Sequence, residues 1–340
     1  MMHDTSIINT FLNTTGIQAF LERDGVTEII VNRPHEIITE SREGWQYHDA
    51  PGASYSDLLD LAIAINGYND GAEPLDAAHP IRSLVMPGGE RMQVIMPPAC
   101  EAGCLSVTIR KPSLTRFSLD DYIQSGRFAD VRFAGKTTPD LTDTQRHLLG
   151  LFGKARENHA EFRAFFQAAV DARLNFLVVG GTGSGKTTIA KAIADLFPRE
   201  RRIITIEDVH EMPLPYHRNH VHLFYKQGGV QARYLIEAAM RMKPDHIFLA
   251  ELRGDEAWSY LEALNTGHEG SITTIHANNT YASFARLASI VKQSTVGLTL
   301  DYDFVLKTIK TSIDVVLFFN HTRMTEIYFS PAEKNQLLAA

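Results

Sequence analysis

The stretch LNFLVVGGTGSGKTTIAKAIADLF, residues 174–197, decides the fold of this chain. An apolar run at 174–179 predicts a buried strand, and the residues at 185–197 predict a helix. Between them, residues 180–187 satisfy the pattern G-x-x-x-x-G-K-[ST], in the strand–loop–helix context that a phosphate-binding loop requires. We therefore expect an α/β sheet that carries a nucleotide site.

The loop at 180–187 contains the residue types that phosphate binding needs. Glycines let backbone N–H groups close around the phosphates, and the helix N-terminus favours negative charge. Lys186 is expected to neutralise phosphate oxygens, and the hydroxyl of Thr187 to ligate Mg²⁺. The predicted contacts to the nucleotide are Gly181, Thr182, Gly183, Ser184, Gly185, Lys186, Thr187 and Thr188. The pattern leaves the reaction open, because kinases, GTPases and motors share it.

A group of acidic residues follows the predicted strand at 202–206. Glu207 and Asp208 come directly after it, and Glu211 lies three residues further on. Because the carboxyl ends of strands in an open α/β sheet face the ligand crevice, these carboxylates can hold Mg²⁺ or its waters. We expect all three to contribute to the metal site and Glu207 to act in catalysis; a solvated acidic loop is the alternative.

Glu251 ends the next apolar strand, at 246–250, as the acid of a Walker B element does. Ala250 stands where the Mg²⁺-binding Asp usually lies, so the metal would depend mainly on Thr187 and bridging waters. Glu251 is expected to polarise the attacking water. His276, which follows a predicted strand at 271–275, is expected to contact the γ-phosphate.

Two other groups of residues are of types that bind metals, but neither group is a complete metal site. His217, His220 and His222 have ligand-like spacing without a companion acid or cysteine in register, so we interpret them as a polar loop. Cys100 and Cys104 are too few for a four-cysteine zinc site, and we expect reduced thiols.

Strands and helices alternate from about residue 145 onward, which predicts a mostly parallel sheet covered on both faces. Earlier residues form short strands, turns and one helix at 56–66, as in a smaller α+β domain. Ile7, Ile8, Phe11 and Leu12 lie at helical spacing near the start of the chain. We expect this segment to pack on that domain; binding to a partner or a membrane surface is the alternative. The expected organisation is an N-terminal domain at 1–134, a linker at 135–144 and an ATPase-like domain at 145–340.

The composition is that of an ordinary globular protein, with 340 residues, 44% hydrophobic and 21% charged. Lys and Arg total 33 against 40 Asp and Glu, and this net charge of −7 argues against a dominant nucleic-acid surface. No apolar stretch reaches the roughly 18 to 20 residues of a membrane-spanning helix, and the N-terminus lacks the features of a secretory signal. We expect a cytoplasmic protein whose membrane contact is peripheral.

Four motifs in the second half resemble those of the secretion ATPases in the RecA-like superfamily. They are the Walker A motif at 180–187, the Asp box IEDVHE at 206–211, an atypical Walker B motif AELRGDEA at 250–257 and the His box TGHEGSITTIHA at 266–277. The chain is most similar to the VirB-type traffic ATPases of type IV secretion, because the first half also matches. The matching segments there are GVTEIIVNRP at 25–34, PLDAAHPIRSLVMPGGERMQVIMPP at 74–98 and SVTIRKPS at 106–113.

The resemblance implies a RecA-like ATPase domain and a smaller N-terminal domain that forms rings and covers the nucleotide. It places Arg110 and Arg91 over the phosphates, with Arg110 among the catalytic residues. It also implies a cytoplasmic homo-hexamer that uses ATP and Mg²⁺ to power pilus assembly and the export of protein or conjugative DNA–protein substrates. The implied partners are inner-membrane secretion components, including other secretion ATPases and the coupling protein. Direct sequence-specific nucleic-acid binding is not expected.

Two alternatives stay open at this point. A type II secretion or type IV pilus motor shares the motifs, although type II assembly ATPases usually carry a four-cysteine zinc module and this chain has two cysteines. A nucleic-acid-binding module that uses ATP as a clamp is disfavoured by the net charge, by the lack of a nucleic-acid-binding motif and by Glu251.

Overall fold

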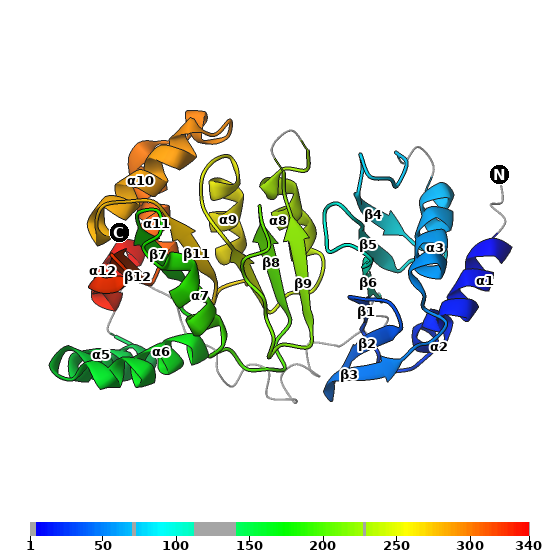
Figure 1. The fold of residues 1–340 in the computed structure, drawn as a ribbon, viewed down its shortest axis with the longest axis horizontal. Coiled ribbons are helices and arrows are strands. Elements are labelled where there is room, and N and C mark those ends of the chain that lie inside the picture. Colours follow the sequence, from blue (N-terminus) through cyan, green and yellow to red (C-terminus); the bar gives the residue numbers. More distant parts are fainter. Residues whose placement is uncertain (1–4, 70–72, 112–140, 227–228, 340) are drawn as a thin grey trace.

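The computed structural model describes residues 5–69, 73–111, 141–226 and 229–339, which form two domains side by side (Figure 1). We call the described residues up to 111 the N-domain and those from 141 onward the C-domain. The predicted linker at 135–144 lies mostly outside the described residues, and its last two residues already belong to a helix, α5 (Asp143–Glu157). Within the described ranges, no helix combines the length and apolarity needed to cross a membrane.

The N-domain is an antiparallel sheet with helices on one face. Its elements are α1 (Ser6–Thr15), α2 (Ile17–Leu21), β1 (Glu28–Val31), β2 (Glu36–Ser41), β3 (Gly44–Asp49), α3 (Tyr55–Tyr68), β4 (Ile81–Val85), β5 (Arg91–Ile95) and β6 (Ser106–Arg110). The strand order is β3-β2-β1-β6-β5-β4, and α1 and α3 lie on the side away from the C-domain (Figure 1). Ile8 and Leu12 of α1 are buried in this domain's own core and Phe11 packs against it, as predicted, whereas Ile7 is exposed.

Successive side chains along the N-domain strands point to opposite faces of the sheet, and the two faces have different surroundings. Ile29 and Ile109, which are register partners, pack into the core beneath the helices. Glu28 and Arg110, one residue away and also partners, lie on the opposite face, which is turned toward the C-domain. Ile95 of β5 is buried in the core of the C-domain. The N-domain sheet therefore packs between its own helices and the C-domain.

The C-domain contains a mixed sheet in the order β13-β12-β7-β11-β10-β8-β9, parallel except for the β12–β13 pair. Its strands are β7 (Phe176–Gly180), β8 (Ile203–Glu207), β9 (His220–Phe224), β10 (His246–Leu249), β11 (Ile272–Ile275), β12 (Val315–Asn320) and β13 (Arg323–Phe329). Its helices are α5, α6 (Phe162–Asp171), α7 (Lys186–Ala194), α8 (Ala232–Met240), α9 (Glu256–Leu264), α10 (Thr280–Gln293), α11 (Tyr302–Ser312) and α12 (Pro331–Ala339), with short 3₁₀ turns at His159–Glu161 and Gly297–Thr299. The predicted α/β class is confirmed.

Two hydrophobic cores cover the two faces of the C-domain sheet. Val178 faces the core shared with α6 and α7, whereas Val179, the next residue, faces the core shared with α8, α9, α10 and α11. A strand that is buried on both faces has no polar positions to expose, and this explains why β7 is apolar throughout. The sequence pattern identified this strand correctly for the same reason.

Among the elements that the sequence pattern did not identify, α5 and β9 bear on the arrangement of the two domains. Helix α5 begins with a capping box, in which Thr142 accepts from the backbone N–H of Gln145 and the Gln145 side chain accepts from the backbone N–H of Thr142. Strand β9 pairs in parallel with β8 and forms the edge of the sheet next to the N-domain. On its other side, the backbone N–H of Phe224 donates to the carbonyl of Ala99 at 2.9 Å. The N-domain thus docks on the edge strand of the C-domain sheet.

Candidate active site

The phosphate loop joins β7 to α7, as the sequence predicts. Gly180 has a φ of 157°, and a Cβ there would lie 2.4 Å from the backbone oxygen of Phe319, so the position requires glycine. Gly185, with a φ of 90°, precedes the first helical residue, Lys186. The Lys186 ammonium is buried and donates to the carbonyls of Gly180 and Gly181 at 3.0 and 2.8 Å. A buried ammonium at the N-terminus of a helix suits a phosphate group.

Glu251 lies at the centre of a group of charged side chains beyond the end of β10. Its Oε1 is 3.1 Å from Nε2 of His276, and its Oε2 accepts from Arg253 at 2.5 Å. Arg253 also donates to Asp208 at 2.8 Å. Burial lowers the pKa of Lys186, and the negative charge of Glu251 acts in the opposite direction. The structure thus brings four predicted residues together and adds Arg253 as the link between the two acids.

The hydroxyl of Thr187 donates to Oε2 of Glu211 at 3.3 Å. These two residues belong to different motifs, 24 positions apart, and both were predicted to serve the metal. A hydroxyl and a carboxylate next to a phosphate loop are oxygen donors of the kind that Mg²⁺ prefers. The residues present therefore fit the predicted Mg²⁺, with Thr187 and Glu211 as the adjacent pair.

Glu207 takes a different position from the predicted one. Its side chain is fully buried, and its Oε2 accepts from the backbone N–H groups of Glu211 and Met212 at 2.7 and 2.8 Å. Its Oε1 accepts from the hydroxyl of Thr205 at 2.5 Å and lies 3.2 Å from Nδ1 of His222. Burial alone would raise the pKa of Glu207, but these hydrogen bonds lower it to about 2. The expectation that Glu207 faces the metal directly is corrected, because its acceptor sites are already used inside the protein.

His220 and His222 lie on β9, so the prediction of a polar loop is wrong. His222 is the register partner of Thr205 on β8, and its side chain is 3% exposed. The tertiary structure also supplies the acid that the local sequence lacked: donor atoms of Glu207, His210 and His222 lie within 4.8 Å of one another. Within this cluster Thr205 hydrogen-bonds both Glu207 and His222, so these two side chains are paired without an ion.

Arg91 and Arg110 do not lie beside the phosphate loop of their own chain. Both line a cavity of about 280 Å³ together with Met240 and Arg241, which end α8 and lead into the start of β10. The phosphate loop and Glu251 instead follow the carboxyl ends of strands. In a parallel sheet, strand starts and strand ends form opposite edges. The expectation that these arginines cover this chain's own phosphates is therefore corrected.

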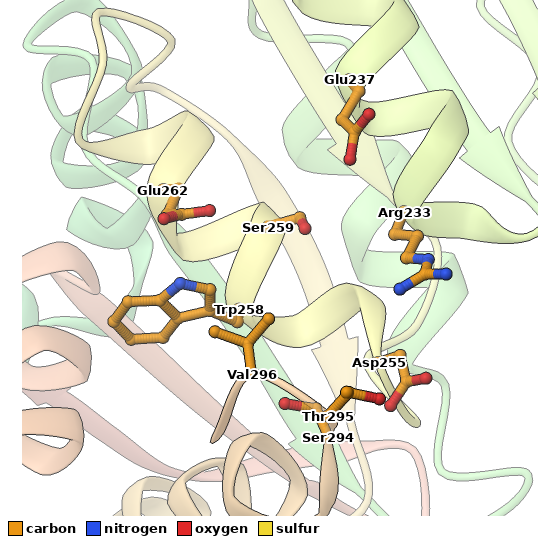
Figure 2. Close-up of a pocket in the computed structure, with 9 residues that line it drawn as sticks. All are labelled: Arg233, Glu237, Asp255, Trp258, Ser259, Glu262, Ser294, Thr295 and Val296. Atoms are coloured by element: carbon orange, nitrogen blue, oxygen red, sulfur yellow. The ribbon is translucent and has the colours of Figure 1, made fainter. Parts of the chain in front are cut away.

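A separate cavity lies between α8, α9 and the segment after α10 (Figure 2). It has a volume of about 220 Å³ and is lined by Arg233, Glu237, Asp255, Trp258, Ser259, Glu262, Ser294, Thr295 and Val296. None of these residues belongs to the phosphate loop or to the acidic group around Glu251. The cavity is therefore distinct from the candidate active site.

Comparison with known proteins agrees with this site. The family model described as "Type II/IV secretion system protein" matches residues 146–324. The chain is 38% identical over 335 residues to "Type IV secretion system protein VirB11" of Brucella suis biovar 1 (strain 1330), an alignment that covers 94% of this chain and 90% of the relative. The chain belongs to the VirB11 family of type IV secretion ATPases. VirB11 of Bartonella quintana (strain Toulouse) is 36% identical over 336 residues, covering 94% of this chain and 93% of the relative.

A solved VirB11 structure matches the whole architecture. It is described as the VirB11 ATPase from the Brucella suis type IV secretion system in complex with sulphate. The TM-score is 0.90 at 38% identity, with 99% of this chain and 98% of that chain covered. The match includes both domains, so the VirB11 family assignment holds for the N-domain as well as for the nucleotide-binding C-domain. The chain is an ATP hydrolase of this family.

Residues that sequence reasoning did not assign to the VirB11-type site are Thr205, His222 and Arg253. Thr205 lies two positions before Glu207 on the same strand, so the two side chains share a face. That spacing was a usable signal. The contact of His222 with these two residues could not be predicted in this way, because it depends on the pairing of β8 with β9, which local patterns did not reveal.

Proposed function

We propose that the chain hydrolyses ATP at the phosphate loop and that Glu251 is the residue that orients and deprotonates the attacking water. The observation that carries this proposal is the position of Glu251: it follows β10 at the same edge as the phosphate loop, within electrostatic reach of Lys186. His276 and Arg253 each contact one of its oxygens. Two fixed contacts hold the carboxylate in one orientation, as a positioned general base requires.

The nucleotide and its metal fit the remaining residues. Backbone N–H groups of the loop, Lys186 and Thr188 would hold the phosphates, and Thr187 with Glu211 would hold Mg²⁺ directly or through water. When bound, Mg²⁺ neutralises charge on the phosphate oxygens. Asp208 holds Arg253 in place, and Glu207 supports the loop that carries Asp208 and Glu211. His276, which contacts Glu251, would also contact the γ-phosphate.

We further propose that the functional form is a homo-hexamer in which Arg91 and Arg110 of one subunit face the nucleotide of a neighbour. The support is the opposite-edge position of these arginines, which line one cavity with Arg241 and are exposed. An arginine fork supplied by another subunit stabilises charge on a transferring phosphoryl group. This assembly would power pilus assembly and substrate export at the cytoplasmic side of the inner membrane. Its partners would be the other secretion ATPases and the coupling protein.

Lys186→Ala tests the assignment of the phosphate loop. The variant should fold and lose hydrolysis, because the point charge that neutralises phosphate oxygens is gone. Lys191→Ala is the matched control, since Lys191 lies on the same helix, α7, in its last turn. Phosphate release and thermal unfolding are measured for both. A folded Lys186→Ala protein with the parent rate would refute the proposal.

A further inference from the structure

Three buried polar side chains form a relay beneath the candidate active site. Nδ1 of His222 lies 2.7 Å from the hydroxyl oxygen of Thr205, which in turn lies 2.5 Å from Oε1 of Glu207. The same nitrogen of His222 also lies 3.2 Å from Oε1 of Glu207 directly. Thr205 and His222 are register partners on β8 and β9, and Glu207 follows two residues after Thr205. All three therefore project from the same face of the sheet. The proposed chemistry above uses neither Thr205 nor His222.

The donors and acceptors in this relay can be assigned by counting. Glu207 is ionised and only accepts, so the single hydroxyl proton of Thr205 must be donated to it. The oxygen of Thr205 then accepts from His222, which requires a proton on Nδ1 of the imidazole. The direction of the chain is therefore from His222 to Thr205 to Glu207. Each group has its partner, as buried polar groups require.

The position of Glu207 determines the loop that follows it. Its other oxygen accepts from the backbone N–H groups of Glu211 and Met212. The same loop carries Asp208, which holds Arg253, and Glu211, which contacts Thr187. A rotation of the Glu207 carboxylate would release two backbone hydrogen bonds and shift both acidic side chains. Displacements of about 1 Å at such positions cost up to about a hundredfold in rate.

Strand β9 connects this relay to the N-domain. The residue after His222, Leu223, forms a β-bridge with Cys100, and Phe224 donates to the carbonyl of Ala99 at 2.9 Å. The edge strand is thus held by β8 on one side and by the N-domain on the other. The place of the His222 imidazole depends on both contacts.

We propose that His222 is a positioning residue of the ATPase site. Through Thr205 and through its own contact with Oε1, it keeps Glu207 in the orientation that holds the loop 208–212, on a strand whose place is set by N-domain docking. The proposal rests on the proposed function, ATP hydrolysis at the phosphate loop. His222 touches no reacting group. Its effect on the rate passes through Glu207.

His222→Leu removes the donor and keeps an apolar side chain of similar size. We expect the turnover number to fall about ten- to a hundredfold, while KM for ATP changes by less than about twofold. His222→Asn places an amide N–H at the δ position and should restore most of the rate. The matched control is His220→Leu, because His220 is a largely buried imidazole on the same face of β9 that contacts the backbone carbonyl of His217. Its ring centroid lies 4.8 Å from that of His222, so this variant also tests whether loss of a neighbouring ring is enough to change the rate. That variant should keep the parent rate.

A double-mutant cycle with Thr205 distinguishes the proposed relay from a general structural effect of the His222 substitution. If the relay operates, the losses caused by His222→Leu and Thr205→Val should be less than additive in the double variant, because both substitutions remove support from the same oxygen of Glu207. Additive losses, a parent-like rate for His222→Leu, or no rescue by asparagine would each overturn the proposal. Lys186→Ala is assayed alongside. An active Lys186→Ala protein would contradict the proposed function itself, whereas an inactive one together with an active His222→Leu protein would contradict only the role of His222.

Discussion

Arg202 should hold the two domains together, and its replacement by methionine should uncouple them. The side chain is fully buried, and it donates to Asn32 and Thr108 of the N-domain and to Asn219 and the carbonyl of Met242 in the C-domain. Burial lowers the pKa of Arg202 to about 10, which leaves it charged at neutral pH. Methionine keeps an unbranched apolar stem, ends before the position of the guanidinium group, and removes all of these donors.

The expected loss can be worked from the contacts. Three of the four hydrogen bonds are 2.8 Å or shorter, and hydrogen bonds from a charged group contribute about 1.5 to 3 kcal/mol each. The parent loses several kcal/mol of stability by removing the guanidinium from water, and the Arg202→Met variant avoids this cost. Asn32 and Asn219 also keep their mutual contact at 3.0 Å. We expect a net loss of about 2 to 4 kcal/mol in the free energy of unfolding, most of it at the domain interface.

The two tryptophans give each domain its own probe. Trp45 lies on β3 and Trp258 on α9, so Trp45→Phe and Trp258→Phe versions each report one domain. Urea unfolding at a fixed protein concentration should show coincident midpoints for the parent and separated midpoints for Arg202→Met. Arg201→Met is the control, because Arg201 is 40% exposed and only reaches Asp245 at 3.4 Å; its loss should stay below about 1 kcal/mol. Coincident midpoints for Arg202→Met, with a loss no larger than the control's, would refute the reasoning.

Three further outcomes are expected. Glu251→Gln should still bind ATP while hydrolysis slows by about a hundredfold, and a parent-like rate in a phosphate-release assay would remove Glu251 as the base. Co-expressed Arg110→Ala and Lys186→Ala subunits should regain hydrolysis that neither variant has alone, because one supplies the loop and the other the arginine; no regain would place Arg110 in its own subunit's site. Burial raises the pKa of Glu28 to about 7, so ionisation of this group should lower the free energy of unfolding of the parent as pH rises from about 4.5 through 7. Glu28→Gln has no such group, so in urea unfolding at pH 7.5 its free energy of unfolding should exceed that of the parent by up to about 3 kcal/mol. A difference between the two proteins that does not change with pH would contradict this.

The C-domain shows which features local patterns can predict. The strand at 174–179 and the phosphate loop were identified because an apolar run and a glycine motif are contained within a few residues. β9 was missed because its sequence, HVHLF, alternates histidine with apolar residues. Histidines are read as exposed when their partners are unknown. Here His222 is buried because Thr205 and Glu207, 17 and 15 positions away, satisfy it.

The N-domain shows the limit of carrying positions over from motifs. Arg110 ends strand β6, and its residue type suits a phosphate. Which phosphate it can reach depends on how the N-domain docks, and the structure turns it toward the strand-start edge of the C-domain sheet. Arg202 is a similar case, since an arginine in a sequence is normally assigned to the surface, whereas this one is fully buried between the domains.

The sequence by itself determined the α/β class, the phosphate loop, the acidic residues at the strand ends and the resemblance to a secretion ATPase. These features depend on periodicity and on short motifs, which are local. Only the tertiary structure decided that Glu207 supports a loop, that Arg253 links Asp208 with Glu251, and that the arginines of the N-domain face away from their own phosphate loop. Each of those depends on hydrogen bonds or burial between segments distant in the chain. Local patterns carry no information about which distant partner satisfies a buried polar group.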